Sequence, residues 1–122
     1  MENIVLVSGV AVSNDEVREL VTTMGGEPGQ HERHVIQRGS AIIFIDYYDT
    51  NLLKSEYEPE ELVKLLSLIG GAIGTAVSIH RSSDLGSLEL QNEFALSFLQ
   101  RWGGVVDTNF GGFLTRDRLG AV

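Results

Sequence analysis

The sequence predicts an α+β fold: a ferredoxin-like plait extended by a third helix and by a C-terminal strand or hairpin. Apolar runs typical of strands alternate along the chain with stretches that repeat apolar residues at helical spacing. Three Gly-Gly pairs, beginning at Gly25, Gly70 and Gly103, each follow a helical pattern and precede an apolar run, which is where a helix must stop. The chain of 122 residues has the size of one domain, and no linker divides residues 1–122.

The first two predicted elements are a central strand and a capped helix. Residues 4–12 are apolar on both faces, as expected of a strand that has neighbours on both sides. Ser13 and Glu16 have the spacing of a capping box and so predict the start of a helix. The apolar residues of that helix share one face: Val17, Leu20, Val21 and Met24.

The middle of the chain predicts a β-hairpin, a loop and a second helix. Residues 33–37 and 41–47 have strand character and flank the short turn Arg38-Gly39-Ser40. Residues 50–57 are expected to form a loop, and Pro59 suits the first position of a helix. The inner face of this helix carries Leu62, Leu65, Leu66 and Ile69.

The last part of the chain adds three strands and the third helix. Residues 72–80 predict a strand, residues 105–106 a short one, and residues 113–115 a final one. A helix from about Leu88 to Trp102 lies between the first two of these, and Trp102 falls on its apolar face and is expected in the core. The first six elements have the order β-α-β-β-α-β of a plait, in which both helices cover one face of the sheet.

Composition and charge narrow the classes of partner. The chain carries a net charge of −8 and no cysteine, which excludes disulfides and thiolate metal sites. Met1 to Ile69 holds 12 acids and 5 bases, a balance of −7, so we expect neither nucleic acid nor a membrane surface as a partner. The N-terminus lacks a secretory signal pattern and no run is long enough to span a bilayer, so a cytoplasmic location is expected.

Two patterns that suggest a cofactor do not fit their surroundings. The glycine-rich stretch at Gly70, Gly71 and Gly74 follows a helix and precedes a strand, whereas a phosphate loop needs the reverse order. His31 and His34 lie where the chain enters a strand, so they are expected to be exposed polar residues and not metal ligands. We therefore predict no cofactor and no metal.

A serine, a histidine and an acid also occur close together at the end of the fourth predicted strand. A catalytic triad needs its members delivered from separate elements, and the chain has no nucleophile elbow. Turn and helix-capping roles explain most of these residues better than catalysis does, so no enzyme is expected. The residues are His80, Ser82, Ser83 and Asp84, with Ser87 at the cap.

The best candidate for a functional site is an acidic, tyrosine-rich stretch. Residues 46–61 carry six carboxylates and one lysine, a balance of −5, and contain all three tyrosines of the chain. Tyrosines supply large contact areas in protein interfaces and acids attract a basic partner, although a plain solvated acidic loop has a similar composition. Strand alternation aims Tyr47 and Tyr48 at opposite faces. The predicted partner-binding residues are Asp46, Tyr47, Tyr48, Asp49, Glu56, Tyr57, Glu58, Glu60 and Glu61.

Residues 94–107, FALSFLQRWGGVVD, resemble the end of some small bacterial immunity proteins of polymorphic or contact-dependent toxin systems. The resemblance covers about the last third of the chain and brings no catalytic residues. It implies a non-enzymatic protein that binds and neutralises a cognate basic toxin domain, such as a nuclease. The alternative is a small-ligand regulatory or sensor module in which Gly9, Gly70, Gly71 and Gly74 let a ligand approach the backbone.

Overall fold

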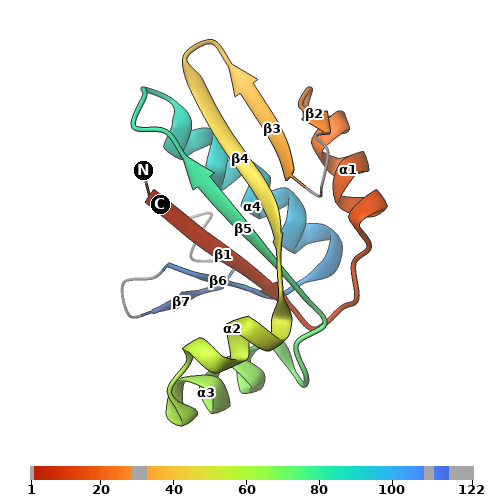
Figure 1. Cartoon of the computed structure of the whole chain (residues 1–122), viewed down its shortest axis with the longest axis vertical. Coiled ribbons are helices and arrows are strands. Elements are labelled where there is room, and N and C mark those ends of the chain that lie inside the picture. The colour runs from red at the N-terminus through yellow and green to blue at the C-terminus, as the bar shows by residue number, and fades with distance from the viewer. Residues whose placement is uncertain (1, 29–32, 109–111, 116–122) are drawn as a thin grey trace.

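The computed structural model describes residues 2–28, 33–108 and 112–115. In these ranges the chain forms one antiparallel sheet and four helices, and none of these helices is long and apolar enough to cross a membrane (Figure 1). The strands are β1 (Glu2–Ser8), β2 (Glu27–Pro28), β3 (Arg33–Arg38), β4 (Ala41–Tyr48), β5 (Thr75–Arg81), β6 (Val105–Asp107) and β7 (Phe113–Leu114). The helices are α1 (Asn14–Thr23), α2 (Thr50–Glu56), α3 (Pro59–Ile69) and α4 (Ser87–Trp102).

The strand order is β2-β3-β4-β5-β1-β6-β7, and every neighbouring pair is antiparallel. The predicted α+β class is confirmed, but this order differs from that of a plait. A plait would place β1 between β4 and β5. Here β4 pairs directly with β5, and β1 lies beyond β5, between β5 and β6, which confirms the central position predicted for it.

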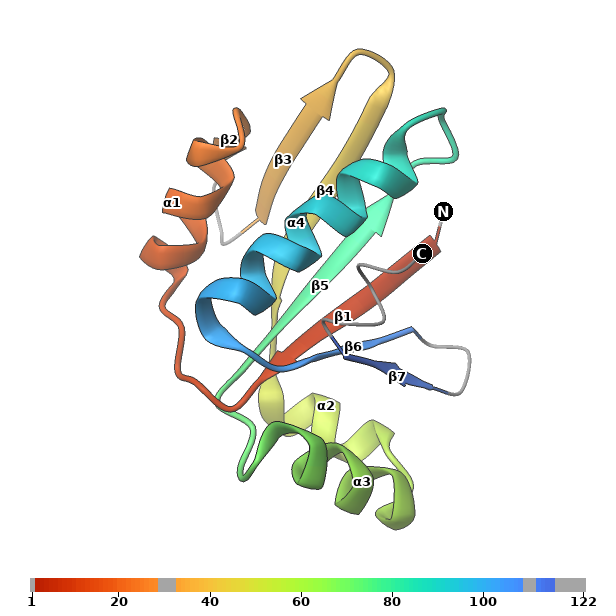
Figure 2. The ribbon, with the colours of Figure 1, turned by 180° about the vertical axis from the view of Figure 1, so that it is seen from behind.

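The helices cover both faces of the sheet, and each face has its own core. In Figure 2, α1 and α4 lie across one face. The first core joins them to alternate strand residues, and its strand members are Leu6, Ile36, Ile43, Ile45, Val77, Ile79 and Val106. The second core joins α2 and α3 to the opposite face through Val5, Val7, Leu53, Leu65, Ile73, Ala76 and Val105. Strand alternation separates the two sets, because successive side chains point to opposite faces.

Local signals in the sequence set the ends of three helices. Ser13 and Glu16 form the predicted capping box at the start of α1. Pro59 is the first residue of α3, and Gly70 ends that helix in the left-handed conformation with φ 79°. Gly103 stops α4 with φ 72°. The beginning of α4 differs from the prediction, because Gly86 and not a serine occupies its N-cap.

Gly104 lets β6 enter the sheet beside β1. Its φ is +117°, and a Cβ at this position would lie 2.1 Å from the carbonyl oxygen of Val7. Val105 then pairs with Val7 in the sheet. No residue with a side chain fits so close to a neighbouring backbone.

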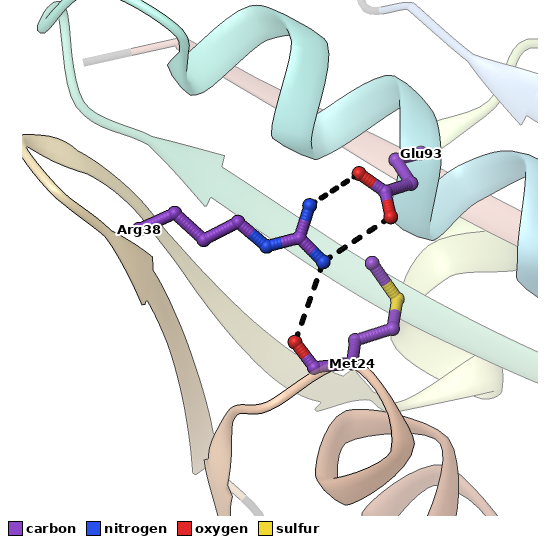
Figure 3. A network of polar contacts seen from close by, with 3 residues as sticks. All are labelled: Met24, Arg38 and Glu93. Atoms are coloured by element: carbon purple, nitrogen blue, oxygen red, sulfur yellow. Dashed lines mark hydrogen bonds and ion pairs between the residues drawn. The ribbon is translucent and has the colours of Figure 1, made fainter.

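An arginine on β3 connects the sheet to both helices of its face. The guanidinium of Arg38 donates to both carboxylate oxygens of Glu93 on α4, at 2.5 and 3.2 Å, and to the carbonyl of Met24 at the end of α1, at 3.4 Å (Figure 3). The hydrogen bond to Glu93 raises the pKa of Arg38 above its ordinary value. The pair is about half exposed, so its contribution to stability is small, of the order of 0.5 kcal/mol.

Candidate functional site: an acidic helical hairpin

The predicted loop over residues 50–57 is wrong, because residues 50–56 form α2. The Asp49 carboxylate accepts hydrogen bonds from the backbone amides of Asn51 (2.8 Å) and Leu52 (3.2 Å) and so begins this helix. Seven residues are too few to show a helical period in sequence, although an aspartate at this point is a typical N-cap. With α3, this helix forms what we call the acidic hairpin, residues 49–69, at one end of the sheet (Figure 1).

The acidic hairpin is fixed to the sheet by its apolar inner side. Leu53 of α2 and Leu65 of α3 are buried in the second core, with 2% and 0% exposure. Burying a leucine stabilises a fold by about 2 kcal/mol, so these two contacts hold the two helices in place. The outer side of the acidic hairpin therefore faces solvent in a defined orientation.

Tyr57 connects the acidic hairpin to β6. Its hydroxyl donates a hydrogen bond of 2.6 Å to Asp107, and its ring lies 6.0 Å from the ring of Phe113. Burial, and then this hydrogen bond to a carboxylate, raise the pKa of Tyr57 far above its usual range. Tyr57 is a structural contact of the second core and not a free anchor.

Tyr47 and Tyr48 point to opposite faces of the sheet, as predicted, but both faces are covered. Tyr47 packs against the first core and its hydroxyl donates to the carbonyl of Val12. Tyr48 packs against the second core and its hydroxyl donates to the carboxylate of Glu56. That bond, followed by burial and the charge of Glu56, raises the pKa of Tyr48 to about 12. The three phenol groups thus all have partners inside the molecule.

The carboxylates of the acidic hairpin, in contrast, face solvent. Asp49, Glu56, Glu58, Glu60 and Glu61 are exposed, and among the described residues none has a cation within ion-pair distance. Against these five acids the acidic hairpin carries two bases, Lys54 and Lys64, so its net charge is −3. Glu58 and Glu61 also form the capping box of α3, so part of this charge serves the helix start.

Asp46 belongs to a different surface. It lies on β4, and its carboxylate is 3.5 Å from the guanidinium of Arg33 on β3. The sequence grouped it with the acidic hairpin because only three residues separate it from Asp49. The ion pair places it on the face of the sheet instead.

Exposed apolar side chains add contact area to the acidic surface, and two of them lie beside its acids. Leu52 on α2 is 54% exposed and Val63 on α3 is 69% exposed. On a helix, residues three or four apart are neighbours, so Leu52 lies beside Glu56 and Val63 beside Glu60. Sequence reasoning missed Val63, although it is the one apolar residue of α3 from Leu62 to Leu66 that does not fit the inner face.

The histidines and serines that suggested chemistry have structural contacts. His31 lies outside the described residues, and His34 is fully buried, which contradicts the expectation that it is exposed. Its Nε2 is hydrogen-bonded to Oδ1 of Asn14 at 3.0 Å. His80 is hydrogen-bonded to the buried Ser78 at 3.1 Å.

The serines that follow β5 shape the turn into α4. The hydroxyl oxygens of Ser82 and Ser87 are 2.8 Å apart, and the amide of Asp84 donates to Ser82. Ser87 also accepts from the amide of Ile42 on β4. In the described part of the chain no group of three or more potential metal-ligating residues comes together.

A second feature is a hollow of about 470 Å³ where the carboxyl ends of α3 and α4 meet the loop after β1. Glycines form most of its wall, and Trp102 borders it. The ring of Trp102 also lies 4.9 Å from that of Phe98, so the predicted core contact of this residue is present. The glycines are Gly9, Gly70, Gly71, Gly103 and Gly104; Gly74 borders a separate hollow beside Tyr47, Tyr48 and Asp49.

Comparison of the chain with protein-family models, with curated proteins and with solved structures gives no significant match. The inference of function therefore depends on the surface itself. Among the residues that the structure describes, its exposed carboxylates have no cation within ion-pair distance, and the exposed Leu52 and Val63 lie among them.

Proposed function

We propose that the chain is a non-enzymatic binding protein whose acidic hairpin docks onto a basic surface of a protein partner. The observation that carries the proposal is the set of five exposed carboxylates, none of which has a cation within ion-pair distance among the described residues, together with the exposed apolar residues Leu52 and Val63. Unpaired exposed charge accelerates association with an oppositely charged partner, and the apolar residues supply contact area once the two are bound. In this proposal Leu52 and Val63, and not the tyrosines predicted from the sequence, are the apolar residues that contact the partner.

The partner class that we favour is a toxin domain, which makes the chain an immunity protein. Support comes from the resemblance of residues 94–107 to immunity proteins and from the net charge of −8. Nuclease toxins bind nucleic acid and are basic, so an acidic surface on an inhibitor competes with the phosphate backbone. If a toxin gene lies beside the gene for this chain, its product is the first protein to test for binding.

The test compares two glutamates that occupy equivalent places in different helices. Glu60 lies in the first turn of α3 and Glu89 in the first turn of α4, and both are exposed. Glu60→Lys should slow association with the partner by about tenfold at low salt, whereas Glu89→Lys should leave it near the wild-type rate. Equal effects of the two substitutions would remove the acidic hairpin as the docking site.

The glycine-lined hollow favours a second candidate function, the binding of a small cation. Two helices end at it, and the carboxyl end of a helix carries partial negative charge. None of its described lining residues is charged, and Trp102 is the aromatic residue among them. The guanidinium of Arg101 lies 5.8 Å from the centre of the Trp102 ring, so a bound cation would share this indole with Arg101. Trp102 is the one tryptophan of the chain, so its fluorescence reports on the hollow directly.

Titration with tetramethylammonium chloride tests this second function, with sodium chloride as the control for ionic strength. Binding should change the fluorescence of Trp102 in a saturable way and raise the melting temperature at the same concentrations. A response equal to that of sodium chloride would exclude the hollow as a site for organic cations.

A further inference from the structure

A hollow of about 460 Å³ lies where the chain passes from the sheet into the acidic hairpin. Three segments that are distant in the sequence form its wall: the loop between β1 and α1, the end of β4 with the start of α2, and the start of β5. We call it the junction hollow, and it is bordered by residues 11–13, 47–50 and 74–76. It shares no residue with the glycine-lined hollow beside Trp102.

Asp49 is the one charged residue among the described residues that border the junction hollow. The backbone amides of Asn51 and Leu52, which its carboxylate caps, both donate to the same oxygen, Oδ1. Within the described part of the chain, Oδ2 has neither a hydrogen-bond donor nor a cation within ion-pair distance. The residue is exposed, so this second oxygen is available to a ligand.

A second available acceptor comes from the next residue of the chain. Thr50 is half-buried and borders the junction hollow, and its hydroxyl has no hydrogen-bond partner among the residues that the structure describes. The other threonine of the wall, Thr75, is already occupied, because its hydroxyl accepts from the amide of Val12 and donates to the carbonyl of Val10, both at 2.7 Å. The junction hollow therefore presents a carboxylate oxygen and a hydroxyl side by side.

These two acceptors suit a cationic group that only donates hydrogen bonds. A guanidinium has several N–H donors in one plane and no acceptor, so it can donate to a carboxylate and a hydroxyl at once. The aliphatic stem of an arginine packs against apolar surface, which Ala11 and Ala76 supply here. A single carboxylate is too few ligands for a calcium ion, and its charge disfavours an anion.

We infer that the junction hollow is the binding site for an arginine side chain that the basic partner of the acidic hairpin presents. The inference rests on the proposed function for the molecule that carries the arginine, and it adds the place of one anchoring contact. Charges at the rim of an interface mainly set the rate of association, whereas a charge paired inside a pocket mainly sets the rate of dissociation. Asp49 should therefore control a different rate from the other acids of the acidic hairpin.

The first experiment uses N-acetyl-arginine amide as the probe and follows the backbone amides by NMR. The probe should shift the amides of residues 11–13, 47–50 and 74–76 in a saturable way and bind several-fold more tightly than N-acetyl-lysine amide, while sodium chloride controls for ionic strength. Asp49→Asn keeps Oδ1 for the two capping amides and puts a donor in place of Oδ2, so it should abolish this response.

The matched control is Glu58→Gln. It removes one charge from the N-cap residue of α3, in the same acidic hairpin, but Glu58 does not border the junction hollow, so this variant should bind the probe like wild type. Thr50→Val keeps the shape of the side chain and should weaken binding of the probe several-fold. Equal responses of Asp49→Asn and Glu58→Gln, or shifts that do not saturate in the wild type, would overturn the inference.

The second experiment measures binding kinetics with the basic partner. Asp49→Asn and Glu58→Gln should slow association alike, because each removes one charge, but Asp49→Asn alone should also speed dissociation, by about tenfold. If Glu60→Lys slows association more than Glu89→Lys and the arginine probe does not bind, the inference fails and the proposed function stands. If the probe binds at the junction hollow and Glu60→Lys and Glu89→Lys act equally, the arginine site stands and the acidic hairpin fails as the docking surface.

Discussion

Tyr57 and Asp107 lie fifty residues apart in the chain and are joined by a hydrogen bond of 2.6 Å. Tyr57 stands between α2 and α3, and Asp107 ends β6, so this contact ties the acidic hairpin to the edge region of the sheet. It also shows why the tyrosines cluster in the sequence. They surround the point where β4 leaves the sheet and the helices begin, and they attach that junction to both cores.

Removal of the Tyr57 hydroxyl should destabilise the protein. Tyr57→Phe keeps the ring and deletes a half-buried hydrogen bond to a carboxylate, so the free energy of unfolding should fall by about 1.5–3 kcal/mol. The matched control is Tyr48→Phe, which deletes a hydroxyl that donates to the exposed Glu56. In this control the free energy of unfolding should fall by only about 0.5 kcal/mol. Urea unfolding measures both, and an equal loss in the two variants would contradict this account of Tyr57.

The stability of the protein should fall at alkaline pH because of two phenols. The pKa values of Tyr48 and Tyr57 are both raised above the ordinary 10.0, that of Tyr48 to about 12. A raised pKa means that the folded protein favours the neutral phenol, so this stabilisation is complete below pH 10 and is lost as the pH rises towards 12 and beyond.

Tyrosinate absorbance checks this prediction in the native and the urea-unfolded protein. In the native state, the phenols of Tyr48 and Tyr57 should ionise at a higher pH than they do in urea. Tyr48→Phe should remove the one that titrates near pH 12. A native titration in which all phenols ionise near pH 10 would count against these hydrogen bonds.

Replacement of Gly104 should be far more harmful than replacement of another glycine with positive φ. Gly104→Ala adds a Cβ 2.1 Å from the carbonyl oxygen of Val7, and the sheet pairing of Val7 with Val105 resists the necessary shift. We expect a loss of about 3 kcal/mol or more. Gly25 has φ +79° and open space around it, so Gly25→Ala should cost only about 1 kcal/mol. Similar melting temperatures for the two variants would contradict the close approach.

Gln91 should be replaceable with a gain in stability. Its Oε1 is buried on α4 and has no hydrogen-bond partner among the described residues. Gln91→Met keeps the length of the side chain and removes the unsatisfied oxygen, which should raise the free energy of unfolding by about 1 kcal/mol. The control Gln100→Met, on the exposed side of the same helix, should change the free energy of unfolding little. A loss of stability in Gln91→Met would show that the Gln91 amide makes a stabilising contact.

Local sequence signals predicted the elements better than their arrangement. The capping box of Ser13 and Glu16, Pro59 at the start of α3 and Gly70 at its end are contacts within one turn, so the sequence reports them directly. The order of β4, β5 and β1 depends on which face α2 and α3 cover. The apolar residues of an amphipathic helix show which side of the helix is buried, but not which face of the sheet it packs against. A plait and the observed strand order are therefore compatible with the same sequence pattern.

The candidate site was predicted in part for the same reason. Charge is visible in a sequence, and the acids of the hairpin are exposed as expected. The hydroxyls of Tyr47 and Tyr57 bind Val12 and Asp107, which are distant in the chain. No local sequence pattern predicts such contacts. The burial of His34 could have been foreseen, because strand alternation places it on the same face as Ile36.

The position of β1 between β5 and β6 has a consequence for synthesis of the protein. Val7 pairs with Ala76 on one side and with Val105 on the other, so β1 is synthesised long before either of the two strands that pair with it. During that interval an apolar strand with two open edges is available to other nascent chains. Efficient production in cells should therefore depend on holding chaperones more than on the stability of the finished fold.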